Sequence, residues 1–167
     1  MILYVTGFLL LGVTLYAVHV IVKKRSEGKR QMRVSLAYYR MVKKAKLAVE
    51  NSELLKGRVI GLDRKNKKLL LIDHNKLKKQ EQCIALTEIA SCEVHEVKDQ
   101  SNNSIKEIYL EFKPKTNNKH YRFCFFDESK DTKTDLPFLK KQALSWKNRI
   151  DVHKYPSTVN RAFEYVL

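Results

Sequence analysis

The sequence predicts an α+β protein with an N-terminal membrane anchor, and three changes in its periodicity indicate this fold class. The first 22 residues form an apolar run, and residues 54 to 126 then alternate between apolar and polar side chains. After Asp135 the apolar side chains return to spacings of three and four. A period of two is typical of half-buried strands, and the longer spacing is typical of amphipathic helices.

The apolar run at residues 2 to 22 is predicted to be a transmembrane helix. It contains no charged side chain, and its polar exceptions are Thr6, Thr14 and His19. A helix of this length spans about 31 Å, close to the thickness of the hydrocarbon core of a bilayer. A cleavable signal peptide would begin with basic residues and end in a small-residue cleavage site, and the run has neither.

Basic residues directly after this run predict its orientation. Residues 23 to 47 carry ten Lys or Arg and one Glu, a net charge of +9, against +6 for residues 48 to 167. Positively charged flanks stay in the cytoplasm, so we expect a single-pass protein of the inner membrane with its N-terminus outside and its C-terminal domain in the cytoplasm. The residues expected to contact the membrane surface are Lys23, Lys24, Arg25, Lys29 and Arg30.

Two further helices and six strands are predicted. One helix runs from Arg30 to about Glu53, with a break before it at Gly28, and packs an apolar stripe on the domain (Val34, Ala37, Tyr38, Met41, Ala45 and Ala48). The strands are antiparallel because their connections are short. They are KGRVIGLD, KLLLID, QCIAL, IASCEVHEV, IKEIYLEFK and HYRFCFF.

A closing amphipathic helix follows the strands. Its apolar face combines Leu136, Leu139, Ala143, Trp146 and Ile150, with Trp146 as the buried centre. Thr134 or Asp135 is expected to cap the N-terminus of this helix. The predicted organisation is an anchor at 1–22, a basic juxtamembrane segment and helix at 23–53, a β domain with its closing helix at 54–153, and a tail at 154–167.

A run of strands closed by one helix with a central Trp resembles the pleckstrin-homology-like fold. The stretch IALTEIASCEV is similar to a sequence motif of bacterial proteins with this fold. The stretch FCFFDESKDTKTDL looks like the last strand, acidic loop and helix start of the same proteins. With its anchor, the whole chain resembles uncharacterised bacterial single-pass membrane proteins that carry such a domain in the cytoplasm. The resemblance implies a bent antiparallel β-barrel closed by the C-terminal helix. That fold has seven strands, so either residues 54 to 73 contain another strand or the fold is a neighbouring one.

The sequence lacks the motifs that mark common catalytic, cofactor and metal sites. The glycines do not cluster near a Lys-Ser/Thr pair, and there is no Gly-x-Ser-x-Gly. Cys92 and His95, three apart on a strand, point to opposite faces and do not share a metal ion. Cys83 and Cys124 are expected in the core, and an odd number of cysteines suits a reducing compartment. We therefore expect no enzyme, no cofactor and no metal.

The remaining candidate site is a basic turn. The resemblance implies that Arg64, Lys65, Lys67 and Lys68 occupy the place where pleckstrin-homology-like domains that bind phosphoinositides hold the phosphates. The favoured hypothesis is nevertheless a membrane-tethered, non-catalytic binding or scaffolding module. It would recruit an unidentified protein partner, or add a strand at a sheet edge.

Two alternatives stay open. One is a sensor of anionic lipid headgroups that uses the basic loops. The other is an enzyme or a nucleic-acid-binding protein whose groups meet only in three dimensions. The aromatic residues alternate as core-strand residues do, which argues against nucleic acid. The sequence does not define the oligomeric state.

Overall fold

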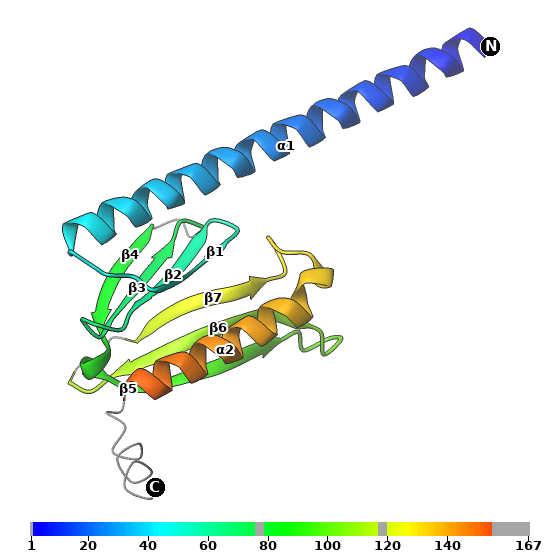
Figure 1. Cartoon of the computed structure of the whole chain (residues 1–167). Helices are drawn as coiled ribbons and strands as arrows, with labels where there is room; N and C mark the ends of the chain where they lie inside the picture. The colour runs from blue at the N-terminus through cyan, green and yellow to red at the C-terminus, as the bar shows by residue number, and fades with distance from the viewer. Residues whose placement is uncertain (1, 76–78, 117–119, 155–167) are drawn as a thin grey trace, which may run out of the picture.

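The computed structural model describes residues 2–75, 79–116 and 120–154; within the first helix it describes the side chains of residues 14–22 and 24–44. A long helix, two antiparallel sheets and a second helix follow one another along the chain (Figure 1). The predicted α+β class is confirmed.

Helix α1 is one uninterrupted helix, Ile2–Lys44. The predicted break at Gly28 is wrong: no atom lies within 4 Å of a Cβ built there, so this glycine sits at the surface of a continuous helix. Glycine in a helix interior costs about 1 kcal/mol relative to alanine, too little to interrupt a helix of this length. The N-terminal half of α1 projects away from the sheets, and its C-terminal part lies over the first of them (Figure 1).

In the described residues, the structure contradicts the predicted transmembrane anchor. Among the residues that it describes, no helix has both the length and the apolar character needed to cross a membrane. The described side chains of the apolar run extend from Thr14 to Val22, nine residues where about 20 are required. The remainder of the predicted anchor, up to residue 13, has side chains outside the described residues. The predictions of a single-pass topology and of an inner-membrane location depended on the anchor and are corrected with it.

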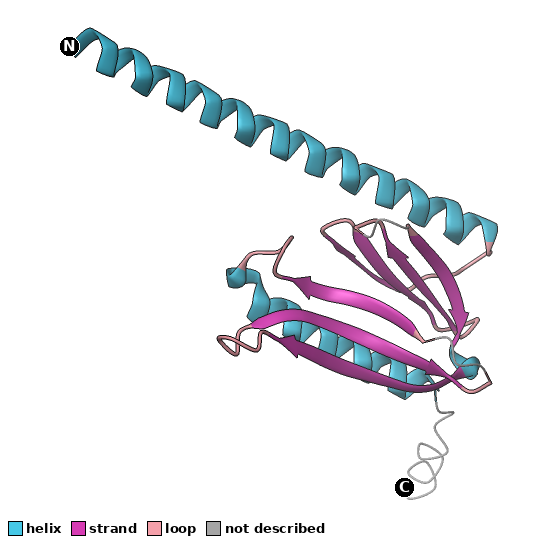
Figure 2. Ribbon diagram, turned by 180° about the vertical axis from the view of Figure 1, so that it is seen from behind, coloured by secondary structure: helices cyan, strands magenta, loops and turns pink. Residues whose placement is uncertain are grey.

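The strands form two separate sheets (Figure 2). Sheet 1 has the order β1-β2-β3-β4, with β1 Asn51–Leu55, β2 Arg58–Asp63, β3 Lys68–Asp73 and β4 Gln80–Ala85. Sheet 2 has the order β5-β6-β7, with β5 Ile89–Lys98, β6 Ile105–Pro114 and β7 Tyr121–Asp127. The predicted barrel is wrong, because a 3-10 turn at Leu86–Glu88 joins β4 to β5 and neither sheet closes on itself.

The described residues contain seven strands, and the one that the sequence did not predict is β1. It pairs with β2 from Asn51↔Leu62 to Leu55↔Arg58. The preceding helix ends at Lys44, well before the predicted Glu53, because Lys46 adopts a left-handed backbone with φ of 50°. The chain is therefore already extended where the helical pattern was expected to continue.

The main core lies between the inner faces of the two sheets and helix α2, Leu136–Lys154. Leu139, Ala143, Trp146 and Ile150 are all buried, and Trp146 is fully enclosed, as predicted. Trp146 Nε1 donates to Glu53 Oε2 at 2.6 Å. The 3-10 turn that leads into α2 has Thr132 as its N-cap, and Asp135 is the third residue of its capping box; neither Thr134 nor Asp135 is the N-cap that the sequence predicted.

A second, smaller core joins α1 to the outer face of sheet 1. It contains Val34, Ala37, Leu47, Val59, Leu70 and Ile72, with Tyr38, Met41 and Ala45 packed against it. The stripe predicted on this helix is thus confirmed over its helical part. Because sheet 1 is covered on both faces, β2 and β3 read as nearly continuous apolar runs.

Candidate functional site

The predicted basic turn connects β2 to β3 and is held by Asp63. The Asp63 carboxylate accepts hydrogen bonds from Asn66 N at 2.9 Å, Asn66 Nδ2 at 2.7 Å and Ala48 N at 2.8 Å. Arg64 lies beside Glu50, with Nε 3.4 Å from Oε2. The side chains of Arg64, Lys65 and Lys67 are exposed, and that of Lys68 is half-buried.

The predicted membrane-contact residues lie at the other end of sheet 1. Lys24, Arg25, Lys29 and Arg30 are exposed on α1, and the side chain of Lys23 is outside the described residues. Arg30 Nη1 donates to Asn75 Oδ1 at 3.1 Å, next to the start of β2, whereas the basic turn follows the end of β2. A strand of this length spans about 20 Å. One small anionic group cannot contact both basic sets.

The cysteines and histidines do not come together as a metal-binding group in the described part of the chain. No group of three or more His, Cys, Asp or Glu side chains with suitable geometry occurs among the described residues. Cys92 is buried, while His95 stacks on Tyr109 of sheet 2 with ring centroids 5.3 Å apart, so the two point to opposite faces as predicted. Cys124 is buried as expected, but Cys83 is exposed, and its predicted place in the core is wrong.

A buried ion pair links the two sheets. Arg58 of β2 donates from Nη2 to Asp131 Oδ2 at 2.8 Å and from Nη1 to Cys124 Sγ at 3.2 Å. Both charged side chains are at most 2 % exposed. These groups are enclosed and mutually paired, so we assign them to the stability of the fold.

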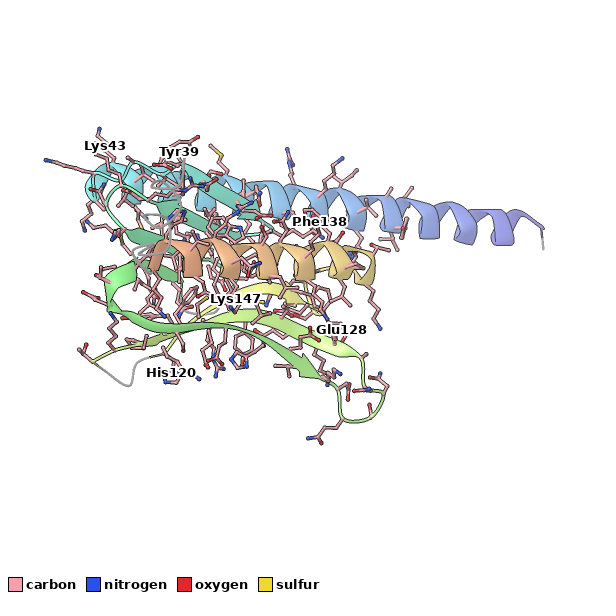
Figure 3. The ribbon with its side chains drawn as sticks, turned by 60° about the horizontal axis from the view of Figure 1, so that its bottom comes forward. Tyr39, Lys43, His120, Glu128, Phe138 and Lys147 are labelled. Atoms are coloured by element: carbon pink, nitrogen blue, oxygen red, sulfur yellow. The ribbon has the colours of Figure 1, made fainter. Side chains whose placement is uncertain are left out.

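The outer face of sheet 2 carries a second polar cluster centred on Glu111. Its carboxylate lies 3.1 Å from Arg122 Nε and 3.5 Å from both His95 Nε2 and His120 Nδ1. Burial alone would raise the pKa of Glu111, but hydrogen bonds and charges from Arg122 and His120 outweigh it and lower that pKa. His120 lies on the side of sheet 2 away from α2 (Figure 3). The charges of this open face are therefore largely compensated by one another.

A depression with a volume of about 430 Å³ lies between α1 and β4. We call it the α1–β4 groove; it is lined by Arg33, Leu36, Ala37, Arg40, His74, Lys79 and Glu81. Glu81 is fixed in it by two partners. Arg40 Nη2 donates to its carboxylate oxygens at 3.1 and 3.2 Å, and His74 Nε2 lies 2.9 Å from Oε1.

The groove runs along a free sheet edge. β4 is the terminal strand of sheet 1, and all six of its residues pair with β3 without a bulge. Its sequence, QEQCIA, contains no Pro and no Lys, the residues that commonly protect edge strands. Both ribbon views place β4 at the outer margin of the sheet (Figures 1 and 2).

The opposite edge of sheet 1 is different. β1 lies beside α2 and the turn before it, because Glu53 accepts from Trp146 and Lys56 Nζ lies 3.0 Å from Asp135 Oδ2. The depression between α1 and β1 has a volume of about 150 Å³. The α1–β4 groove is therefore the larger of these two.

The sequence did not single out this groove. Arg33 and Arg40 belong to the predicted helix, and Lys79 belongs to a basic strand connection. These side chains come close together only because α1 packs against a segment about 40 residues later in the sequence. The only local signal is the polar composition of β4 next to the apolar β3.

Comparison with known proteins gave no match: no family model, no curated protein and no solved structure is significantly similar to this chain.

Proposed function

We propose that this chain is a non-catalytic protein-binding module that takes up an extended segment of a partner as an additional strand on β4. The observation that carries the proposal is a regular, unprotected edge strand that borders a groove of about 430 Å³. An edge strand presents a row of backbone donors and acceptors, and strand addition is a common way to use them.

The geometry of sheets supports this proposal. A strand added to β4 would lie about 4.8 Å from it and would direct every second side chain to the α1 side. Those side chains would enter the groove beside Leu36, whose side chain is 58 % exposed. Backbone pairing would supply affinity and the groove would supply selectivity.

The alternative of a sensor for anionic lipid headgroups has weaker support. The basic turn that it would use lies at the opposite end of sheet 1 from the basic residues around Arg30, and Arg64 is already next to Glu50. An enzyme has weaker support as well. The enclosed cluster around Arg58 is occupied by Asp131 and Cys124, with Arg58 Nε left without a hydrogen-bond partner among the described residues, and the cluster around Glu111 lies on an open sheet face.

Peptide binding to the full chain tests the proposal. The probe is a fluorescein-labelled heptapeptide of alternating Val and Glu, with non-ionic detergent present to cover the exposed apolar side chains of α1. Two matched peptides carry backbone N-methyl groups either on the Val or on the Glu residues. In a strand, only one of these two sets of N–H groups faces β4. We expect one methylated peptide to lose at least tenfold in affinity and the other to keep it; equal effects, or no binding by the unmodified peptide, would overturn the proposal.

The exposed Cys83 locates the bound peptide. A peptide with one central Cys, activated as a mixed disulfide, should exchange onto Cys83, because neighbouring strands bring Cα atoms within disulfide distance. Cys92 and Cys124 are buried and do not compete. Mass spectrometry should find the adduct on Cys83, and Cys83→Ser is the control. Labelling that does not depend on the position of Cys in the peptide would contradict binding at β4.

A further inference from the structure

We infer that the α1–β4 groove selects an acidic partner segment and that Glu81 is a resident carboxylate with which the partner competes. This inference rests on the proposed strand addition and adds the chemistry of the partner. It starts from the charges that line the groove: Arg33, Arg40 and Lys79 are basic, and Glu81 is the acidic residue, which leaves a net charge of +2 with His74 neutral.

The groove already holds one carboxylate. Glu81 bridges Arg40 and His74, and the His74 side chain is only 7 % exposed, so this part of the site is built rather than a loose surface pair. The Arg40 side chain is 68 % exposed and can turn toward a ligand that lies above it. A carboxylate from a partner would meet the same donors that Glu81 uses.

Two further cations are available for a partner. Among the described residues neither Arg33 nor Lys79 is paired with a carboxylate; the Nε of Arg33 donates to the carbonyl of Lys29 at 3.3 Å within the same helix. Leu36 lies between Arg33 and Arg40 on α1 and offers an apolar contact. A segment in which acidic and apolar side chains alternate fits this arrangement, because a strand directs alternate side chains to one face.

The same charges argue against a second copy of the chain as the occupant. Residues 23 to 47 have a net charge of +9, so an approach of α1 to another α1 would bring like charges together. Like-charge contacts disfavour wrong partners, and opposite charges accelerate association with the correct one. The complementary partner is therefore an acidic segment of another protein.

The experiment compares three peptides and two protein variants. The peptides alternate Val with Glu, Gln or Lys. Arg33→Gln/Lys79→Gln removes the two unpaired cations of the groove, and Arg25→Gln/Lys29→Gln removes the same charge from the exposed part of α1 outside it. We expect the Glu peptide to bind about tenfold tighter than the Gln peptide at physiological salt. The groove variant should lose this preference and the control variant should keep it.

Glu81→Gln gives an independent readout. Because this variant removes the resident carboxylate, we expect several-fold tighter binding of the Glu peptide and little change for the Gln peptide. Equal affinities for the Glu and Gln peptides, or equal losses in the groove and control variants, would overturn the inference. Displacement of the peptide by an oligothymidylate that depends on Arg33 and Lys79 would overturn it in favour of nucleic acid.

The two proposals fail in different ways. If one N-methyl pattern abolishes binding but the charge of the peptide has no effect, strand addition stands and the acidic partner is wrong. If the charge preference depends on Arg33 and Lys79 but both N-methyl patterns are tolerated, the groove binds acidic groups without strand addition.

Discussion

Arg58 and Asp131 connect the two sheets through a buried charge pair. The Arg58 guanidinium reaches from β2 to the loop after β7, where Asp131 also accepts a hydrogen bond from Asp127 N at 2.9 Å. A buried ion whose partner is removed keeps its desolvation cost without compensation. This pair is therefore a sensitive point for stability.

We expect Asp131→Asn and Arg58→Met each to lower the free energy of unfolding by about 3–5 kcal/mol. The double variant should lose less than the sum of the single variants, because it leaves no unpaired buried charge. Urea unfolding followed by circular dichroism measures all three. Single losses below about 1 kcal/mol, or strict additivity, would contradict the assigned role.

The three thiols should differ in reactivity. Burial raises the pKa of Cys92 and of Cys124 to about 12, and the thiolate is the reactive form. Partial burial also raises the pKa of Cys83. Its side chain is nevertheless exposed and can be reached by reagents. We expect iodoacetamide at pH 8 to modify one cysteine per native chain and three per chain in urea, counted by intact-mass spectrometry. Rapid modification of two sites in the native chain would show that Cys92 or Cys124 is accessible.

Cys83 also shows what the sequence cannot predict about single residues. It alternates with apolar neighbours in the same way as Cys124, and both were expected in the core. Cys124 is enclosed because β7 packs on α2 and approaches β3, whereas Cys83 lies on the edge strand β4 and is exposed. Local alternation predicts the face of a strand but not its position in the sheet.

At the scale of elements, Asp63 joins the segment after α1 to the β2–β3 hairpin. Burial alone would raise the pKa of Asp63, but hydrogen bonds from Asn66 and Ala48 and the charge of Lys68 outweigh it, so that pKa lies below its usual value. A carboxyl group with a lowered pKa in the folded state adds stability above its unfolded pKa, about 3.9. That stability disappears as the pH falls through the lower, folded pKa.

We therefore expect the unfolding free energy of the native chain to fall below about pH 4, with part of this fall due to Asp63. Asp63→Asn should be less stable at neutral pH and should show a weaker decrease between pH 4 and pH 2. Urea titrations across this range test the expectation. Parallel pH profiles for the native chain and the variant would exclude Asp63 as a contributor.

The elements that the sequence predicts well are those with a complete periodic face. Helix α2 has an apolar residue at every three or four positions, and its buried residues are the predicted ones. β1 was missed because NSELL has no β-branched residue and follows directly on a helical pattern. Its strand form depends on pairing with β2 rather than on its own composition.

The candidate site was less predictable than the fold. The basic turn could be recognised because four of the five residues 64–68 are basic, yet the structure separates it from the basic residues around Arg30. The α1–β4 groove arises where α1 crosses sheet 1, and the path of that helix is set by the second core around Val34, Ala37 and Ile72. Such packing has no signature in a short stretch of sequence.

At the scale of the whole molecule, α1 has two different parts. Its C-terminal part lies over sheet 1 (Figure 2) and is bound to it through the second core. Nearer its N-terminus, Leu15, Tyr16 and Ile21 are more than 60 % exposed. Exposed apolar surface of this kind favours association. From the second core we expect the folded domain to include part of α1, with an N-terminal limit before the predicted boundary at residue 54.

The last prediction concerns this boundary. We expect residues 30–154 to unfold cooperatively with a free energy close to that of the full chain, because they contain both cores. Residues 54–154 lose most of β1 and expose Val59, Leu70 and Ile72, which are at most 3 % exposed in the full chain. Each such side chain contributes about 1.5–3 kcal/mol, so the shorter fragment should lose about 5 kcal/mol or more. That is a large part of the stability of a small domain.

Urea unfolding measured by the fluorescence of Trp146, the only Trp in the sequence, compares the fragments with the full chain. Trp146 lies in the main core and reports on the whole fold. Because residues 54–154 also lack Glu53, which accepts a hydrogen bond from Trp146, the unfolding midpoints are compared and not the native fluorescence intensities. The added peptide Gln31–Ala48 in trans provides a control, because it should restore stability only if the second core is the missing component. A fragment 54–154 as stable as 30–154 would show that α1 contributes no stability to sheet 1, and the α1–β4 groove would then lack the fixed wall that the proposed function requires.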